Sequence, residues 1–209
     1  MARSPFLRAY AAVAAADVVL AAGGGRRSAR RLTKPALMPL LMAHVATSED
    51  GDGTKPLVLA GLGLSCAGDV ALLGEGEGPF AAGLGSFLAA HLCYLAAFAK
   101  RRKGSGRRVR WPAFLYGLAW VGLNAVLLPK TGRMRVPVLV YGSALAAMAV
   151  AALDTGDAKV AAGGAVFMVS DSILALDTFG AAAIPAADGL VMLTYTAAQA
   201  LIAAGMVTA

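Results

Sequence analysis

The sequence contains little cysteine and little charge, and both shortages exclude common protein classes. Two cysteines in 209 residues exclude a disulfide scaffold and leave no spacing typical of a structural zinc site. Charged residues make up 15% of the chain, against about 25% in soluble domains. Hydrophobic residues reach 58% and the mean hydropathy is +0.68. The chain is therefore not an ordinary soluble domain.

The charge that is present is mostly positive, with 19 Lys and Arg against 12 Asp and Glu. A nucleic-acid-binding protein needs a solvated basic face with polar neighbours, and the apolar excess here argues against nucleic acid as a partner. Positive charge also sets membrane topology. Seven basic residues lie between residues 100 and 110. We therefore expect this loop and both termini to lie on the cytoplasmic side of a bacterial inner membrane.

Long apolar stretches dominate the rest of the sequence. A helix that crosses a bilayer needs about 20 apolar residues, and this window predicts eight spans. They cover residues 5–22, 32–47, 56–73, 80–99, 111–128, 136–153, 159–176 and 188–208. The connections are short and Gly-rich or charged, as water-facing loops are. The fold class predicted is all-α, a polytopic integral membrane bundle forming a single domain over residues 1–209.

Two of these spans have irregular features. The second contains Pro35 and Pro39, so a kink or tilt is expected there. The first has Arg3 and Arg8 ahead of an Ala-rich run, as a secretory signal has. Asp17 interrupts that run, and we therefore favour a spanning helix.

Four polar residues lie inside odd-numbered spans, which cross the membrane in the same direction. Asp17, Asp69, Asn124 and Asp171 each follow the start of their span by 12 or 13 residues. At 1.5 Å per residue they share one layer, roughly 6–9 Å below one membrane face. Ionisable residues at such depth cost about 2.5–3.5 kcal/mol each and indicate function. Carboxylates this close cannot all ionise, an arrangement that suits acid–base chemistry or a proton-coupled transporter.

Other polar residues outside this layer are also candidates for a functional role. His44 and His91 lack the spacing of a metal pair, so neither a metal nor another cofactor is expected. The helical rise places His91 about 12 Å deeper than the carboxylates. Lys34, next to Pro35 and nearest the second span, is the cation predicted to hold a lipid phosphate.

Five segments of the chain are similar to one family. They are TKPALMPLL at 33–41, GLSCAGDVALL at 63–73, FAAGLGSFLAAHLCYLAAF at 80–98, GGAVFMVSDSILA at 163–175 and YTAAQALI at 195–202. In this order they resemble the YhhN-like family of lysoplasmalogenases, which are eight-helix membrane proteins. The resemblance implies hydrolysis of the vinyl-ether bond of an ethanolamine or choline lysoplasmalogen. The products would be a fatty aldehyde and a glycerophospho-alcohol, and the partners a lysophospholipid substrate and membrane lipids.

The resemblance also implies roles for the polar residues. Vinyl-ether hydrolysis begins with protonation of an alkene carbon, and water then captures the oxocarbenium ion. Two carboxyl groups can divide this work, as in glycosidases, and Asp69 and Asp171 are the expected catalytic pair. The residues expected to bind substrate or water are Lys34, His91, Asn124, Tyr195 and Gln199. A proton-coupled transporter using the same carboxylates is the alternative, although transporters usually show helices broken at the midplane.

Overall fold

The computed structural model of the chain describes residues 4–23, 27–49, 51–104 and 106–207, and these contain eight α-helices. They are α1 (Pro5–Ala22), α2 (Arg27–Ala46), α3 (Lys55–Ala71), α4 (Glu77–Lys100), α5 (Gly106–Leu127), α6 (Arg135–Asp154), α7 (Ala158–Thr178) and α8 (Ala187–Met206). A 3₁₀ turn, η1 (Gly132–Met134), precedes α6. Each helix overlaps one of the predicted spans. The all-α membrane bundle expected from the sequence is confirmed.

Within the described ranges, five helical segments are long and apolar enough to cross a membrane. These are α1, α4, α7 and α8, together with Gly132–Asp154, which joins η1 to α6. The helix α3 has 17 residues, and α2 and α5 begin with clusters of basic residues. Those basic turns are helical in spite of their charge. The apolar window therefore placed the start of both helices too late.

Local signals explain where several helices begin. Proline lies in the first turn of α1 and of α3, where its missing N–H costs nothing. Asp157 caps α7, and its Oδ1 accepts hydrogen bonds from the N–H groups of Lys159 at 2.8 Å and Val160 at 3.0 Å.

The helix α2 continues through both of its prolines. Pro39 has no N–H for the carbonyl of Pro35, four residues earlier. The thiol of Cys66 on α3 contacts that carbonyl at 3.6 Å instead. A side chain of the neighbouring helix thus takes up an acceptor that the proline leaves without its usual donor.

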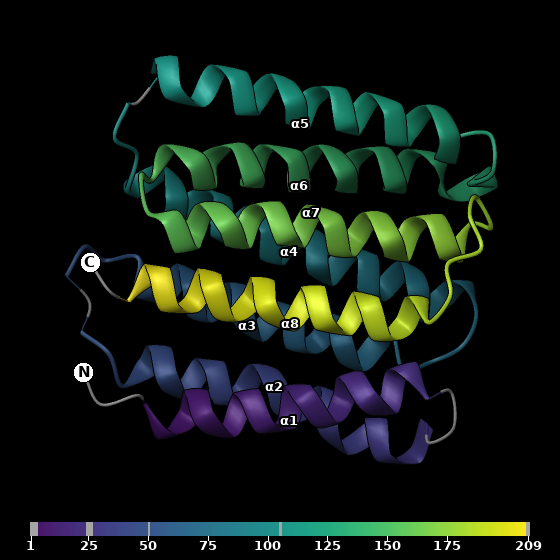
Figure 1. The fold of residues 1–209 in the computed structure, drawn as a ribbon, viewed down its shortest axis with the longest axis horizontal. Helices are drawn as coiled ribbons and strands as arrows, with labels where there is room; N and C mark the ends of the chain where they lie inside the picture. The colour runs from purple at the N-terminus through teal and green to yellow at the C-terminus, as the bar shows by residue number, and fades with distance from the viewer. Residues whose placement is uncertain (1–3, 24–26, 50, 105, 208–209) are drawn as a thin grey trace.

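Seven of the eight helices close a ring. The contacts run from α1 through α2, α3, α4, α6, α7 and α8 and back to α1. Along this ring α8 also touches α2 and α3, whereas α5 packs outside it against α6 and α7. Figure 1 shows α5 at one edge of the bundle and both termini at the same end. The other end carries the connections α3–α4, α5–α6 and α7–α8, together with the end of α1 and the start of α2.

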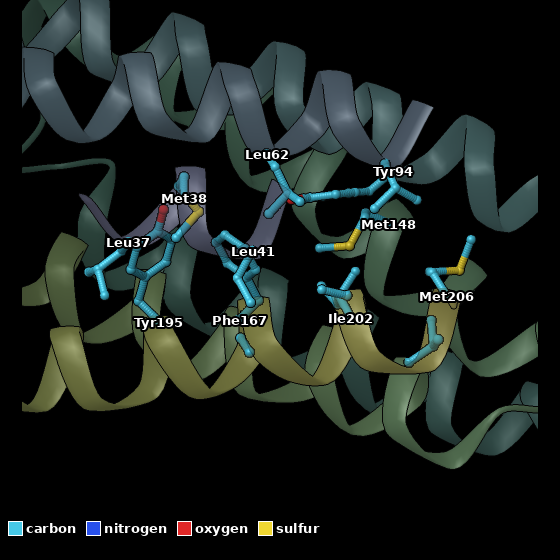
Figure 2. Packing of buried hydrophobic residues seen from close by; sticks show 14 of the residues in the cluster. Leu37, Met38, Leu41, Leu62, Tyr94, Met148, Phe167, Tyr195, Ile202 and Met206 are labelled. Atoms are coloured by element: carbon cyan, nitrogen blue, oxygen red, sulfur yellow. The ribbon is translucent and has the colours of Figure 1, made fainter. Parts of the chain in front are cut away.

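The buried apolar side chains form one core inside the ring. Figure 2 shows part of this core, with Leu37, Met38 and Leu41 of α2 and labelled side chains from α3, α4, α6, α7 and α8. Glycine permits the closest approach between α3 and α4. A Cβ at Gly61 would lie 2.5 Å from the ring of Tyr94, and one at Gly68 would lie 2.7 Å from Phe87. Small residues bring membrane helices together in this way.

Candidate active site

A large hollow opens at the end of the bundle opposite the termini. Its volume is about 1060 Å³, and α2, α8 and the connections α3–α4 and α5–α6 contribute to its walls. Five basic side chains line it, Arg30, Arg31, Lys34, Lys130 and Arg133. Three acidic ones, Glu75, Glu77 and Asp188, line it too. We refer to this feature as the basic hollow.

A second, smaller cavity of about 90 Å³ lies between α4, α5, α6 and α7. Most of its lining is aliphatic or aromatic, and we refer to it as the apolar cavity. It shares Leu72, Phe80, Leu174 and Phe179 with the basic hollow. The rings of Phe80 and Phe179 pack edge to face with centroids 5.9 Å apart. The two spaces are therefore neighbours separated by one apolar wall.

The carboxyl group of Asp171 lines the apolar cavity. The hydroxyl of Tyr141 on α6 donates a short hydrogen bond to its Oδ2. Among the described residues no cation pairs with Asp171. This carboxyl thus faces an apolar space with one neutral donor.

Asp69 has very different surroundings. Its Oδ1 lies 3.4 Å from Nζ of Lys34, and its Oδ2 accepts a hydrogen bond of 2.7 Å from the hydroxyl of Tyr195. Asp69 is 1% exposed and Lys34 is 8% exposed. The carboxylate lines neither the hollow nor the cavity, whereas Lys34 lines the hollow. Helices α2, α3 and α8 thus meet in a buried ion pair.

A row of rings connects the surroundings of the two carboxyl groups. Neighbouring rings in the order Tyr195, Phe167, His91 and Tyr141 have centroids 5.6, 4.8 and 5.2 Å apart. His91 is completely buried in this row, and neither of its nitrogens has a hydrogen-bond partner in the described part of the chain. The structure thus places His91 among these rings and not in the lining of either space.

The other polar residues predicted from the sequence, Asp17, Gln199 and Asn124, lie at three separate places in the bundle. Thr33 donates a short hydrogen bond to Asp17, and Arg30 lies 3.8 Å from the same oxygen. Gln199 accepts from Tyr94 at 2.7 Å and donates to Ser65 at 3.0 Å, a buried contact between α3, α4 and α8.

Asn124 lines the apolar cavity together with Asp171. Within the described ranges no group of three His, Cys, Asp or Glu side chains could hold a metal ion.

Sequence reasoning missed Tyr141 and Trp120, which both line the apolar cavity. An aromatic residue inside an apolar span is usually a packing residue. Only the hydroxyl of Tyr141 and the indole N–H of Trp120 could have indicated a role in the site. Nothing in the sequence shows in which direction these groups point.

The fold and site define an α-helical membrane protein with a basic hollow and two carboxyl groups near it. Asp69 is buried in an ion pair, and Asp171 is half-buried against the apolar cavity. Comparison with known sequences agrees with this class. The chain belongs to the YhhN family, whose sequence profile matches residues 29–206.

Named relatives come from bacteria and from a mammal. Proteins of Mycobacterium bovis and Mycobacterium tuberculosis, each named lysoplasmalogenase, are 31% identical over 196 residues, covering 87% of this chain and 73% of theirs. A Bos taurus protein named lysoplasmalogenase TMEM86A is 36% identical over 157 residues, covering 70% of this chain and 63% of its own. No solved structure matches the chain significantly.

Proposed function

We propose that this protein is a lysoplasmalogenase, which hydrolyses the vinyl-ether bond of an ethanolamine or choline lysoplasmalogen. The products are a fatty aldehyde and a glycerophospho-alcohol. One observation carries the proposal: a basic hollow and an apolar cavity share a wall, and Asp171 lines the cavity. An amphiphile with an anionic head and an alkyl chain fits such a pair of spaces. The names of the relatives support the same activity.

The charges of the basic hollow suit the head of this substrate. Lys130 and Arg133 come from the α5–α6 connection and Arg31 from α2, and all three are exposed within the hollow. Because Nζ of Lys34 already faces Asp69, these three cations are better placed to bind the phosphate. Glu77 lines the same hollow and supplies negative charge for an ammonium group. The vinyl-ether end of the alkyl chain then lies across the shared wall, against the apolar cavity.

Asp69 and Asp171 have different hydrogen-bonding and charged partners, and these partners assign each carboxyl group a different role in the reaction. A buried charge without a partner is costly, whereas a paired one is tolerated. Asp69, with Lys34 and Tyr195, is therefore the carboxylate that stays ionised. Because it lines neither space, it stabilises positive charge from a distance and not by contact. Asp171, with Tyr141 alone, is the acid. It gives its proton to the alkene carbon remote from the ether oxygen. The π electrons form the new C–H bond, and a lone pair of the ether oxygen forms the C=O bond of an oxocarbenium ion. Water adds to that ion, and the hemiacetal collapses to aldehyde and alcohol.

Orientation follows from the same geometry. The two termini lie at the end of the bundle away from the basic hollow (Figure 1). With the seven basic residues of the 100–110 segment on the cytoplasmic side, both termini are cytoplasmic in the proposed bacterial inner membrane. The basic hollow then faces the opposite side.

The test is aldehyde release by purified protein in detergent from a vinyl-ether lysolipid and from its ester-linked analogue. Asp171→Asn removes the proton donor, and a general acid contributes about 10²–10⁴-fold to the rate. We expect a loss of that size, and a smaller loss for Asp69→Asn. Asp177→Asn is the matched control, because Asp177 lies on the same helix and is exposed.

Two results would contradict the proposal. Folded, monodisperse wild-type protein that releases no aldehyde from either lipid would do so. A full rate in Asp171→Asn would also do so. Proton flux into liposomes that depends on Asp171 would then favour a transporter.

A further inference from the structure

Two buried polar atoms in the lining of the apolar cavity have no hydrogen-bond partner among the described residues. They are Oδ1 of Asn124 and Nε1 of Trp120, which lie one helical turn apart on α5. Asn124 is 7% exposed, and its amide nitrogen donates to the carbonyl of Trp120 at 2.8 Å. A Cβ at Gly142 of α6 would lie 3.4 Å from Nε1 of Trp120. Glycine at this position thus keeps the indole N–H edge clear.

The other polar side chains of the same cavity are satisfied. Tyr141 donates to Asp171, and the hydroxyl of Ser172 donates to the carbonyl of Met168 at 2.7 Å. Among the described residues of this lining, the fully buried atoms left unpaired are one acceptor and one donor, and each buried polar atom left unpaired costs about 1–3 kcal/mol. A water molecule bound between the two atoms would satisfy both of them. The cavity of about 90 Å³ exceeds the ~30 Å³ that a water molecule occupies in the liquid.

We propose that Asn124 and Trp120 form a binding site for the water molecule that hydrolysis consumes; this rests on the function proposed above. The water accepts a hydrogen bond from Nε1 of Trp120 and donates one to Oδ1 of Asn124. Its second hydrogen points to Asp171 once that residue has given its proton to the alkene. Both α5 residues are positioning residues, because they orient the nucleophile that attacks.

Asp171 donates the proton that starts the reaction and later accepts the proton that the water releases. A lone pair of the water forms the new C–O bond to the oxocarbenium carbon, while the second O–H bond of the water breaks. The released proton goes to Asp171, which returns to its acid form as the hemiacetal is made. One group thus acts as acid and then as base, as the acid of a retaining glycosidase does.

Competition with methanol measures how firmly this water is held. Methanol that captures the oxocarbenium ion gives a mixed acetal, whereas water gives aldehyde, and mass spectrometry counts both. Asn124→Leu and Trp120→Phe keep the bulk of each side chain and remove one hydrogen-bonding group. We expect the acetal-to-aldehyde ratio to rise about two- to tenfold in either variant, the range that one neutral hydrogen bond is worth. Ser172→Ala is the matched control and leaves the ratio at its wild-type value.

This ratio does not depend on the amount of folded protein, so partial misfolding does not mimic the effect. Wild-type protein that makes neither product would refute the proposed function. An active wild type, with ratios unchanged in both Asn124→Leu and Trp120→Phe, would instead refute the water site alone.

A spectroscopic measurement tests the site without turnover. The sequence contains two tryptophans, so Trp111→Phe leaves Trp120 as its single indole. Ultraviolet resonance Raman spectra report whether an indole N–H is hydrogen-bonded. We expect a bonded N–H that weakens when Asn124→Leu is added. A free N–H in the Trp111→Phe protein would overturn the water site whatever the activity.

Discussion

The ion pair between Lys34 and Asp69 offers the sharpest test of the site's architecture. Its atoms lie 3.4 Å apart, and both residues are at least nine-tenths buried. Lys34→Met keeps the length of the side chain and removes its charge. Asp69 is then left as a buried carboxylate with Tyr195 as its remaining hydrogen-bond donor.

The expected loss follows from this burial. Removing one partner of a buried ion pair typically costs about 3–5 kcal/mol, whereas replacing both partners is often neutral. For a chain of this length, 1 kcal/mol corresponds to roughly 2–4 °C in Tm. Lys34→Met should therefore lower Tm by roughly 6–20 °C. Lys34→Met combined with Asp69→Asn should recover most of that loss, because the double variant buries no charge at this position.

Thermal unfolding in one detergent, followed by near-ultraviolet circular dichroism, compares the wild type, both single variants and the double variant. The cycle isolates the interaction energy of the two side chains. A double variant whose loss equals the sum of the single losses would show that the residues do not interact. An unchanged Tm in Lys34→Met alone would refute the buried pair just as directly.

Two further predictions concern charges outside the buried core. Partial burial would raise the pKa of Asp52, but hydrogen bonds from Arg101 and Thr54 outweigh it and hold the pKa below its ordinary value. The stabilisation by Asp52 is therefore present above its ordinary pKa and lost as pH falls through the lowered one. Asp52→Asn should lower Tm by roughly 2–4 °C at neutral pH, for about 1 kcal/mol, with no difference from wild type in strong acid; a loss of equal size at both pH values would contradict this. Arg133→Ala with Lys130→Ala should raise KM about three- to tenfold, the effect of a weakened phosphate contact, and leave kcat unchanged in steady-state assays. Arg135→Ala, outside the lining of the hollow, is the control, and an equal rise in KM there would point to general charge effects.

The sequence was sufficient to predict the helices, because the length and apolarity of a stretch determine whether it forms a membrane-spanning helix. The first helix begins and ends at the predicted residues, and each of the others overlaps its predicted span. The charged first turns of α2 and α5 were left out of the predicted spans. The helix α2 begins at Arg27, five residues before its predicted span, because basic residues form helix readily although an apolar window rejects them.

The sequence predicts where a site residue lies along the axis of its helix, but not on which side of the helix it lies. Rise per residue gives depth, and it predicts that Asp69 and Asp171 lie in one layer. It does not give the rotation of each helix about its axis, which determines whether Asp69 meets Lys34 or faces a cavity. The same lack of rotation kept Tyr141 and Trp120 out of the predicted site. Those contacts depend on how four helices pack, which no local pattern records.

The wall of Leu72, Phe80, Leu174 and Phe179 between the two spaces has a consequence for what happens after the bond breaks. In the reaction proposed above, the substrate before cleavage is one amphiphile, held at both ends. Afterwards the aldehyde belongs in hydrocarbon and the glycerophospho-alcohol in water, on opposite sides of that wall. Each product then dilutes into a different phase, and the two seldom meet again at the site. In the proposed reaction, this partition of the products adds to the driving force of hydrolysis.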